Sequence, residues 1–340
     1  MSPDPKQIVL CKFWFASAAV FVLFAASITL MHAQDASQQT TPKPSSTARP
    51  ARLGMPAQEQ KTFSSPEQAA QALYDAARNH DEKALIAILG NGARDIVIWT
   101  ADQSERYTQD DVFAKKYEQM HRFVAEPDNE TTLYVGAENW PLPLPLIERN
   151  GVWFFDSDLG RKEILFRRIG ENEMDAISAL SGIIAAQNQF NAETGQYAQH
   201  LNCSAGQHDG LFSPENGNDM GKNPLGPYLA EASYTRSDRV PFHGYYFLIL
   251  TAQGPRAHGG AHSYIVNGKM TSGFAVVGFP AVYRSSGVKT FIVNQYGMIY
   301  EKDLGPKTSE IASAMKAYDH DGTWARVRPN QFLTGISPNP

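Results

Sequence analysis

Cysteine is scarce in this chain of 340 residues, where Cys11 and Cys203 are the only two. Cys11 precedes the apolar run near the N-terminus, so it does not have the position of a lipid-modified cysteine. A chain cleaved after that run keeps one cysteine, which excludes an internal disulfide and leaves stability to packing. We expect Cys203 to be a small, mostly buried hydrophobic residue, because no His–Asn/Asp motif of a cysteine-enzyme family accompanies it.

The signature motifs of several enzyme classes are also missing. The sequence has no Walker A loop, H-E-x-x-H helix, C-x-x-C pair, dinucleotide fingerprint or G-x-S-x-G elbow. The S-x-x-K matches at residues 286–289 and 313–316 lack a companion K-T-G, so they are interpreted as chance. The net charge of -5 without a Lys/Arg run argues against a nucleic-acid partner. No cofactor is expected.

Long hydrophobic runs are limited to residues 13–31, which follow Lys6 and Lys12 and precede Ala33. This order of basic, apolar and small residues is typical of a secretory signal, so residues 1–33 are expected to be a signal peptide. A retained anchor in the inner membrane is the open alternative, because the run is almost long enough to span a bilayer. The predicted location is therefore periplasmic or otherwise extracytoplasmic. Residues 34–61, rich in Ser, Thr, Pro, Gln and Ala, are expected to form a disordered linker.

Residues 62–170 are predicted to form an N-terminal α+β domain. Ser65, Pro66 and Gln68 match the start of a helix, and Asp81 and Thr108 are the expected starts of two more. Strands are expected at residues 131–135, 142–147 and 152–155, the last two joined by an Asn-Gly turn typical of a hairpin. Three helices followed by a curved antiparallel sheet resemble the cone-like nuclear-transport-factor-2-like fold.

Residues 171–328 are predicted to form a second domain, in which a long helix packs on an antiparallel sheet, and residues 329–340 a tail. The helix is expected at about residues 172–192, the main strands at 244–251, 273–279, 290–294 and 298–302, and a short helix at 311–318. This order resembles the soluble domain of type IV pilins and pseudopilins. The resemblance rests on residues 185–187, Tyr197, 244–247, 291–295 and 297–300. It concerns the fold alone, because the hydrophobic N-terminal helix of a pilin is missing.

The segment 140–173 is the most distinctive part of the sequence. It contains the run Trp140-Pro-Leu-Pro-Leu-Pro, the aromatic strand ending at Phe154-Phe155-Asp156, and a charged end with Arg167-Arg168. With residues 259–261, 266–270, 273–275, 291–293 and 299–305, it resembles the bacterial exported family labelled domain of unknown function 2950. The resemblance covers about residues 60–325. It implies location and architecture, and no activity.

Two groups of residues are weak candidates for a ligand site. Trp140 and Trp153 could form a sugar- or peptide-binding platform, although core packing is the favoured interpretation. Arg167 and Arg168 could bind an anion, but Glu163 and Arg167 are spaced i,i+4 as in a helical ion pair. We expect these charges to join the two domains.

His258 and His262 are the weak candidates for a metal site. Two histidines four residues apart can share a metal on a helix, but two glycines separate them here, so solvated loop histidines are favoured. The segments 156–160 and 319–322 imitate the start of a calcium loop. Both lack the acid at position ~12, so we interpret them as turns.

Three functions remain open after these exclusions. We favour a non-catalytic envelope module that binds or scaffolds a partner protein, peptide or cell-wall component, because no nucleophile, base and electrophile converge. The second hypothesis is a metal-assisted hydrolase that uses His258 and His262. The third is a small-molecule or lipid receptor with an apolar pocket in the N-terminal cone.

Overall fold

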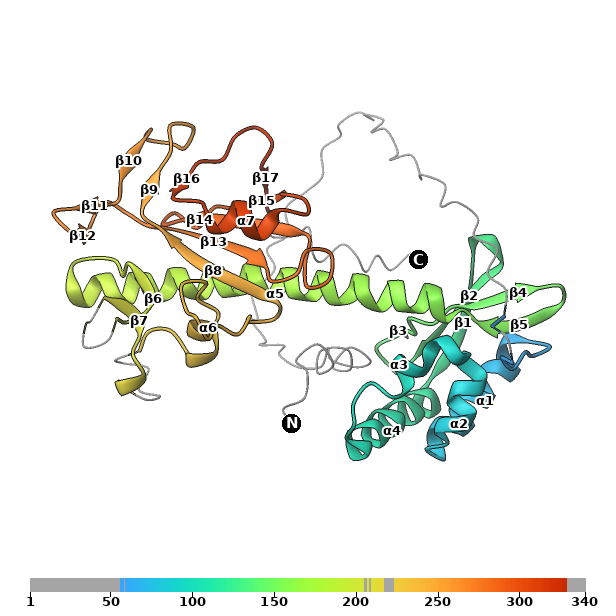
Figure 1. The fold of residues 1–340 in the computed structure, drawn as a ribbon. Helices are drawn as coiled ribbons and strands as arrows, with labels where there is room; N and C mark the ends of the chain where they lie inside the picture. The colour runs from blue at the N-terminus through green and yellow to red at the C-terminus, as the bar shows by residue number, and fades with distance from the viewer. Residues whose placement is uncertain (1–55, 58, 205–206, 208, 217–222, 329–340) are drawn as a thin grey trace, which may run out of the picture. The chain divides into compact units, whose positions relative to one another are not determined.

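The computed structural model describes residues 56–57, 59–204, 207, 209–216 and 223–328. The expected signal, tail and most of the expected linker lie outside these residues. The fold is mixed α+β with antiparallel main sheets, as the sequence predicts (Figure 1). The chain separates into two compact units, Met1–Ile164 and Leu165–Pro340, and the boundary falls inside helix α5 (Ser157–Thr194). We call them unit 1 and unit 2 and describe each by itself.

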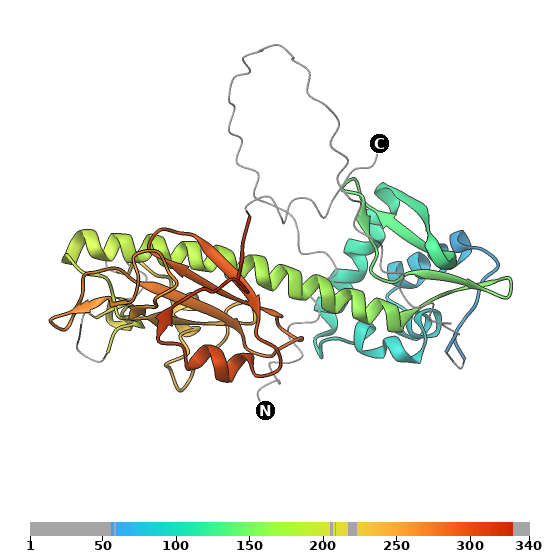
Figure 2. The ribbon, with the colours of Figure 1, turned by 90° about the horizontal axis from the view of Figure 1, so that it is seen from above.

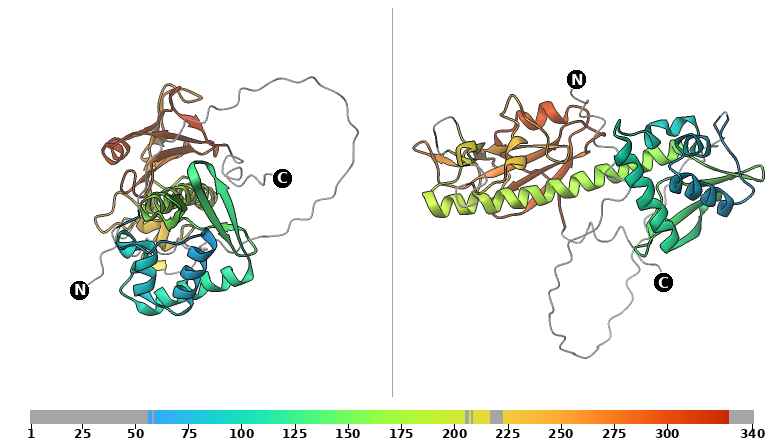
Figure 3. Two further views of the ribbon diagram at one scale, coloured as in Figure 1. Left: turned by 90° about the vertical axis from the view of Figure 1, so that its right-hand side faces the viewer. Right: turned by 90° about the horizontal axis from the view of Figure 1, so that it is seen from below.

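Unit 1 begins with a helical layer in which α1 packs against α2 and α4 (Figure 3). The helices are α1 (Pro66–Arg78), α2 (Glu82–Leu89), the 3-10 turn η1 (Asn91–Ala93), α3 (Arg94–Val97) and α4 (Gln103–Gln119). The predicted caps of the first two are confirmed, because Ser65 accepts from Gln68 N at 3.3 Å and Asp81 from Ala84 N at 3.0 Å. The predicted start of the third at Thr108 is wrong. Asp102, six residues earlier, caps α4 by accepting from Ser104 N at 2.9 Å.

The sheet of unit 1 is antiparallel, with strand order β1-β2-β4-β5 and β3 beside β2. Its strands are β1 (His121–Glu126), β2 (Glu130–Val135), β3 (Trp140–Pro141), β4 (Leu146–Arg149) and β5 (Val152–Phe155); the 3-10 turn η2 (Pro127–Asn129) joins the first two. Asn150 and Gly151 form the expected turn with φ of 54° and 80°. Leu73, Phe113, Leu133 and Phe155 are fully buried between helices and sheet.

Helix α5 is longer than the sequence predicts, since it begins at Ser157 rather than near Asn172. The carboxylate of Asp156 starts it by accepting from Asp158 N at 3.0 Å and Leu159 N at 2.9 Å. Arg167 and Arg168, among the charged residues expected to join the two domains, thus lie within this helix. The buried face runs through Ala176, Leu180, Ile183 and Phe190, whereas Met174 is 41% exposed.

Unit 2 is built on an antiparallel sheet with the order β17-β15-β14-β13-β8. The strands are β8 (Tyr245–Leu250), β13 (Ala275–Pro280), β14 (Lys289–Asn294), β15 (Ile299–Asp303) and β17 (Ala325–Arg326). Smaller sheets are formed by β10 (His262–Ser263), β9 (Ala252–Gln253) and β16 (Ala317–Tyr318), by β11 (Ile265–Val266) and β12 (Lys269–Met270), and by β6 (His200–Asn202) and β7 (Gly210–Phe212). The remaining elements are the turn η3 (Pro214–Asn216) and helices α6 (Pro227–Glu231) and α7 (Thr308–Ser313). The last helix was expected at 311–318; it begins earlier and ends at Ser313, and the chain then enters β16.

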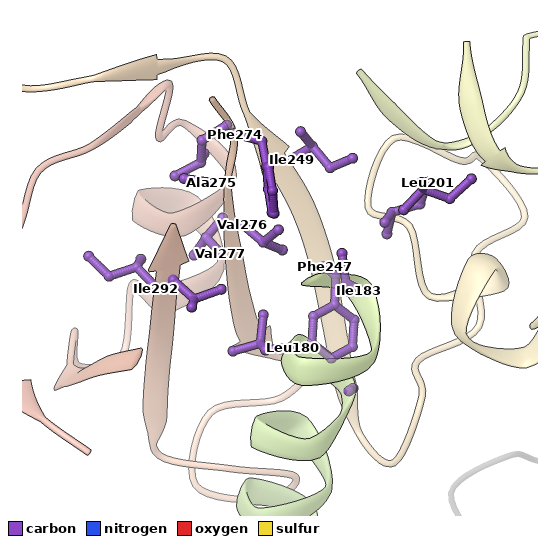
Figure 4. Packing of buried hydrophobic residues seen from close by; sticks show 14 of the residues in the cluster. Leu180, Ile183, Leu201, Phe247, Ile249, Phe274, Ala275, Val276, Val277 and Ile292 are labelled. Atoms are coloured by element: carbon purple, nitrogen blue, oxygen red, sulfur yellow. The ribbon is translucent and has the colours of Figure 1, made fainter. Parts of the chain in front are cut away.

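The C-terminal part of α5 lies along the sheet of unit 2 (Figure 2). Leu180 and Ile183 of α5 lie beside Phe247 of β8 (Figure 4), and all three are fully buried. In register, Phe247 pairs with Gly278 of β13. A Cβ at Gly278 would come within 2.9 Å of the Phe247 ring, so glycine leaves the space that the ring fills.

Polar side chains of α5 also fix loops of unit 2. Gln187 is fully buried, donates to Ala198 O at 2.8 Å and accepts from Ala198 N at 2.8 Å. Glu173 accepts from Val288 N at 2.9 Å and Lys289 N at 3.0 Å. No helix within the described ranges is long and apolar enough to cross a bilayer.

Candidate functional site

A recess in the helical layer of unit 1 combines apolar walls with charged and amide groups. It is lined by Leu85 and Leu89 of α2, Ile96 and Val97 of α3, Trp99, and Arg106, Gln109 and Asp110 of α4. Its cavity volume is about 20 Å³. We call it the α2–α4 recess. Because a water needs at least ~10–15 Å³, this space suits one small group rather than a whole sugar ring or lipid chain.

Local sequence features shape the recess. Leu85 and Leu89 are spaced i,i+4, as are Arg106 and Asp110, so each helix presents one row of side chains. The chain leaves α2 at Gly90, where φ is 86°, a conformation that side chains rarely adopt. This sharp exit allows α3 and Trp99 to form a third wall between α2 and α4.

Arg106 does not provide a free positive charge. Its Nε and Nη2 donate to Glu82 Oε1 at 2.8 Å and 2.6 Å, and its Nη1 donates to Thr100 O at 2.6 Å. The side chain is 11% exposed. The guanidinium is therefore neutralised by one carboxylate and fixed in place, and it serves as a wall of the recess rather than as an anion-binding group.

Asp110 is the titratable group of the recess, with a side chain that is 16% exposed. Burial raises its pKa to about 6, His80 opposes this shift, and the charges of Asp111 and Glu82 add to it. His80 Nδ1 lies 3.6 Å from Asp110 Oδ2, and His80 Nε2 lies 3.4 Å from Asp111 Oδ1. The His80 ring also stacks on Tyr107 at 4.2 Å between centroids. At neutral pH most Asp110 side chains are thus ionised, although the group is poorly hydrated.

Gln109, the residue before Asp110 on α4, also lines the recess and carries an amide acceptor. Its Oε1 is buried and has no hydrogen-bond partner among the described residues, and the same holds for Nδ1 of His80. An unpaired buried acceptor is unfavourable by roughly 1–3 kcal/mol. A ligand that brings an N–H donor into the recess would remove that penalty, while its carbon atoms contact Leu85, Leu89 and Val97.

The two tryptophan candidates lie in the packing of unit 1. Trp153 of β5 exchanges backbone hydrogen bonds with Phe63, at 2.7 Å and 2.8 Å. Trp140 of β3 pairs with Val135 of β2. Both side chains are partly buried against the hydrophobic core, as the favoured interpretation expected.

Arg167 and Arg168 have contacts within α5 and unit 2. The Arg168 guanidinium donates from Nη2 to Ser285 O at 3.0 Å, and burial lowers its pKa. The charge of Arg167 lowers the pKa of Glu171, but burial and Asp175 dominate and raise that pKa to about 7. Arg168 thus fixes the loop between β13 and β14.

His258 and His262 are both exposed. His262 Nδ1 lies 3.1 Å from Gly260 O, and the carbonyl oxygens of His258 and Gly260 accept from Gln253 Nε2 at 2.6 Å and 2.9 Å. Within the described ranges, no three His, Cys, Asp or Glu side chains are arranged to hold a metal ion.

The remaining candidates also have local partners. The thiol of Cys203 donates to Gly210 O at 3.4 Å and is partly buried, which raises its pKa. A raised pKa disfavours the reactive thiolate. Asp156 caps α5, and Asp321 accepts from Thr323 N at 2.8 Å, so the two calcium-like segments contain capped turns in the structure.

The sequence did not single out the residues of the α2–α4 recess. His80 and Asp110 are 30 positions apart in the sequence. The predicted helix start at Thr108 also placed Gln109 and Asp110 in the first turn of the helix, whereas the structure places them in its interior. The adjacent acids Asp110-Asp111 were the available signal. A binding role for these acids could not be predicted, because the burial of Asp110 arises only when α2 packs near α4.

Comparison with known protein families identifies the family of the chain. The model of the family described as "Protein of unknown function (DUF2950)" matches residues 60–327. No curated protein and no solved structure matches the chain. The pilin-like and nuclear-transport-factor-2-like resemblances therefore stay predictions. Since the match spans nearly all described residues, the chain belongs to the DUF2950 family.

Proposed function

We propose that this protein is a non-catalytic binding module of the cell envelope, and that the α2–α4 recess anchors its partner. The group best suited to the recess is a primary ammonium on an aliphatic stem. The observation that carries this proposal is that Gln109, whose buried Oε1 has no hydrogen-bond partner among the described residues, and Asp110 line the same recess with apolar walls. Lysine side chains of an envelope protein and amines of cell-wall peptides both have this chemistry.

The charges around the recess support a cation rather than an anion. Glu82 neutralises Arg106, whereas Asp110 and Asp111 both lie beside the ring of His80. An anionic ligand would therefore meet net negative charge. An ammonium group has three N–H donors and matches both acceptors. The volume of about 20 Å³ admits such a head group, and the stem can lie along the apolar wall.

The proposed location rests on the N-terminal sequence. Lys6 and Lys12, the apolar run 13–31 and Ala33 favour export, with cleavage or anchoring as the two outcomes. Mass determination of the N-terminus of the protein purified from its host envelope tests this. A mature chain beginning near Gln34 supports cleavage, an intact N-terminus in the membrane fraction supports anchoring, and a cytoplasmic intact chain contradicts export.

The binding proposal is tested by nuclear magnetic resonance titration of the full chain with n-butylammonium and, separately, n-butyrate. We expect a saturable shift of the Trp99 indole N–H with n-butylammonium only. Val97→Phe fills the recess and should weaken binding at least tenfold. Ile98→Phe adds the same ring one position away, outside the lining residues, and should leave binding unchanged. Equal binding of butyrate, or full binding by Val97→Phe, would overturn the proposal.

A further inference from the structure

Strand β1 forms an open edge of the unit 1 sheet. It pairs with β2 along its whole length, from His121↔Val135 to Glu126↔Glu130. No other strand in the described part of the chain pairs with it. His121, Arg122, Ala125 and Glu126 are exposed. Such an edge is a template for a further strand unless its side chains prevent pairing.

The hydrogen-bond pattern identifies the backbone groups that face outward. Gly136 N donates to Met120 O at 2.9 Å, which makes Met120 and Gly136 a hydrogen-bonded pair. In an antiparallel ladder these pairs alternate, so Arg122, Val124 and Glu126 bond to β2. Leu142 N donates to Leu133 O at 2.7 Å, so the carbonyl of Leu133 points away from β1. Leu133 lies opposite Phe123, so this pair is not hydrogen-bonded, which confirms the alternation. The N–H and C=O groups of residues 121, 123 and 125 therefore point outward.

The side chains of β1 are complementary to those of a second copy of β1. We propose that two copies of this chain pair antiparallel through β1, with a two-fold axis at Val124. In this register Arg122 of each copy faces Glu126 of the other, and Val124 faces Val124. Phe123 and Ala125 face each other as hydrogen-bonded pairs, since both point their backbone groups outward. Opposite charges directly across a strand pair are stabilising.

Arg122 is already held on the surface where this pairing needs it. Its guanidinium lies over the Tyr134 ring at 4.3 Å, and its Nε donates to Asn139 Oδ1 at 2.7 Å. Among the described residues, its Nη nitrogens donate no hydrogen bond, and these N–H groups are the donors that a carboxylate can accept from. Centring the axis on Phe123 instead would set Arg122 against Val124 and leave Glu126 without a basic partner. The charges thus select one register.

The expected dimer is weak and depends on concentration. A six-residue edge buries less surface than a standard stable interface of ~1,600 Å². Sedimentation velocity of the full chain over a range of concentrations should show a monomer–dimer equilibrium. Arg122→Glu and Glu126→Arg should each raise the dimer Kd at least tenfold, because like charges then face each other. The double variant R122E/E126R should restore the wild-type Kd, and Lys115→Glu on α4 should leave it unchanged.

A cysteine cross-link tests the two-fold axis directly. Non-hydrogen-bonded pairs have Cβ atoms about 4.5–5.5 Å apart, near the range that a disulfide bridges. With Cys11→Ser and Cys203→Ser, the variant V124C should form a disulfide-linked dimer on mild oxidation. The variant A125C, at a more exposed position that faces Phe123, should not. A chain that stays monomeric, a dimer insensitive to Arg122→Glu, or a double reversal without rescue would overturn the proposal.

Discussion

The two units differ in where their buried polar groups lie. In unit 2, Gln187 is bonded in both directions to Ala198, and the orphan hydroxyls of Thr290 and Tyr318 are at most 1% exposed. In unit 1, Gln109, whose Oε1 has no partner among the described residues, is one of the residues that line a recess. An unpaired polar group in closed packing only lowers stability. A polar group on a residue that lines a recess can also gain a hydrogen bond from a ligand. The contrast separates structural polar groups from candidate binding groups.

The largest effect is expected from the closed core of unit 2. Phe247→Ala removes a fully buried ring that packs against Leu180 and Gly278, and should lower the free energy of unfolding by about 3–5 kcal/mol. Hydrogen exchange should rise in β8, β13 and β14, and n-butylammonium should still bind unit 1. Tyr228→Ala is the control, because its side chain is 78% exposed and its loss should change stability by less than about 0.5 kcal/mol. Equal effects of the two variants would contradict this view of the core.

The next effect concerns a satisfied polar group of the same core. Gln187→Ala leaves both backbone groups of Ala198 unpaired and should lower the unfolding free energy by about 2–4 kcal/mol. Gln189→Ala, an exposed glutamine two residues away, is the control and should change it by less than about 0.5 kcal/mol. Chemical denaturation measures both. If Gln187→Ala were as stable as the control, the amide would not be structural, and the comparison between units would fail.

The sequence predicted those parts of the fold that depend on local signals. Ser65 and Asp81 are correct caps because a side-chain oxygen reaches a backbone N–H within the same turn. Helical spacing also predicted a helix at about residues 172–192, which is the part of α5 that carries the face buried in unit 2. Asn150-Gly151 formed the expected turn because both residues adopt positive φ easily.

The sequence did not predict features that depend on distant partners. Strand β1 has exposed side chains on both faces and no apolar alternation, so only its pairing with β2 makes it a strand. Asp102 was overlooked as the start of α4, since the apolar spacing becomes evident only after Thr108. The α2–α4 recess was not predicted for a related reason. The raised pKa of Asp110 comes from burial among helices that are separate in sequence.

A smaller effect is expected for a carboxyl group of unit 2 that has no ligand role. Burial and Asp175 raise the pKa of Glu171 from 4.5 to about 7. Its contribution to stability is thus full below pH 4.5 and is lost as the pH rises through 7. Glu171→Gln should gain thermal stability relative to the wild type between pH 5 and pH 8. Glu193→Gln, at an exposed position of the same helix, is the control and should show no such gain. If Glu171→Gln behaved like this control, the burial of the Glu171 carboxyl group would be contradicted.

The smallest effect on stability, and the most selective effect on binding, is expected at Asp110. Its pKa is raised from 3.8 to about 6, so its contribution to stability is full below pH 3.8 and is lost as the pH rises through 6. A cation needs the ionised form, so the affinity for n-butylammonium should rise as the pH increases from 5 to 7.

Asp110→Asn should remove this pH dependence and weaken binding at pH 7 about tenfold or more, as expected for a lost charge-assisted hydrogen bond. Glu171→Gln carries the same chemical change in unit 2 and should leave binding unaltered. Titrations of both variants at pH 5 and pH 7 would therefore show whether the buried carboxyl group at the recess differs in role from the one on α5. If Asp110→Asn kept the wild-type affinity and its pH profile, Asp110 would have only a structural role, like Glu171. The recess would then have no preference for a cation.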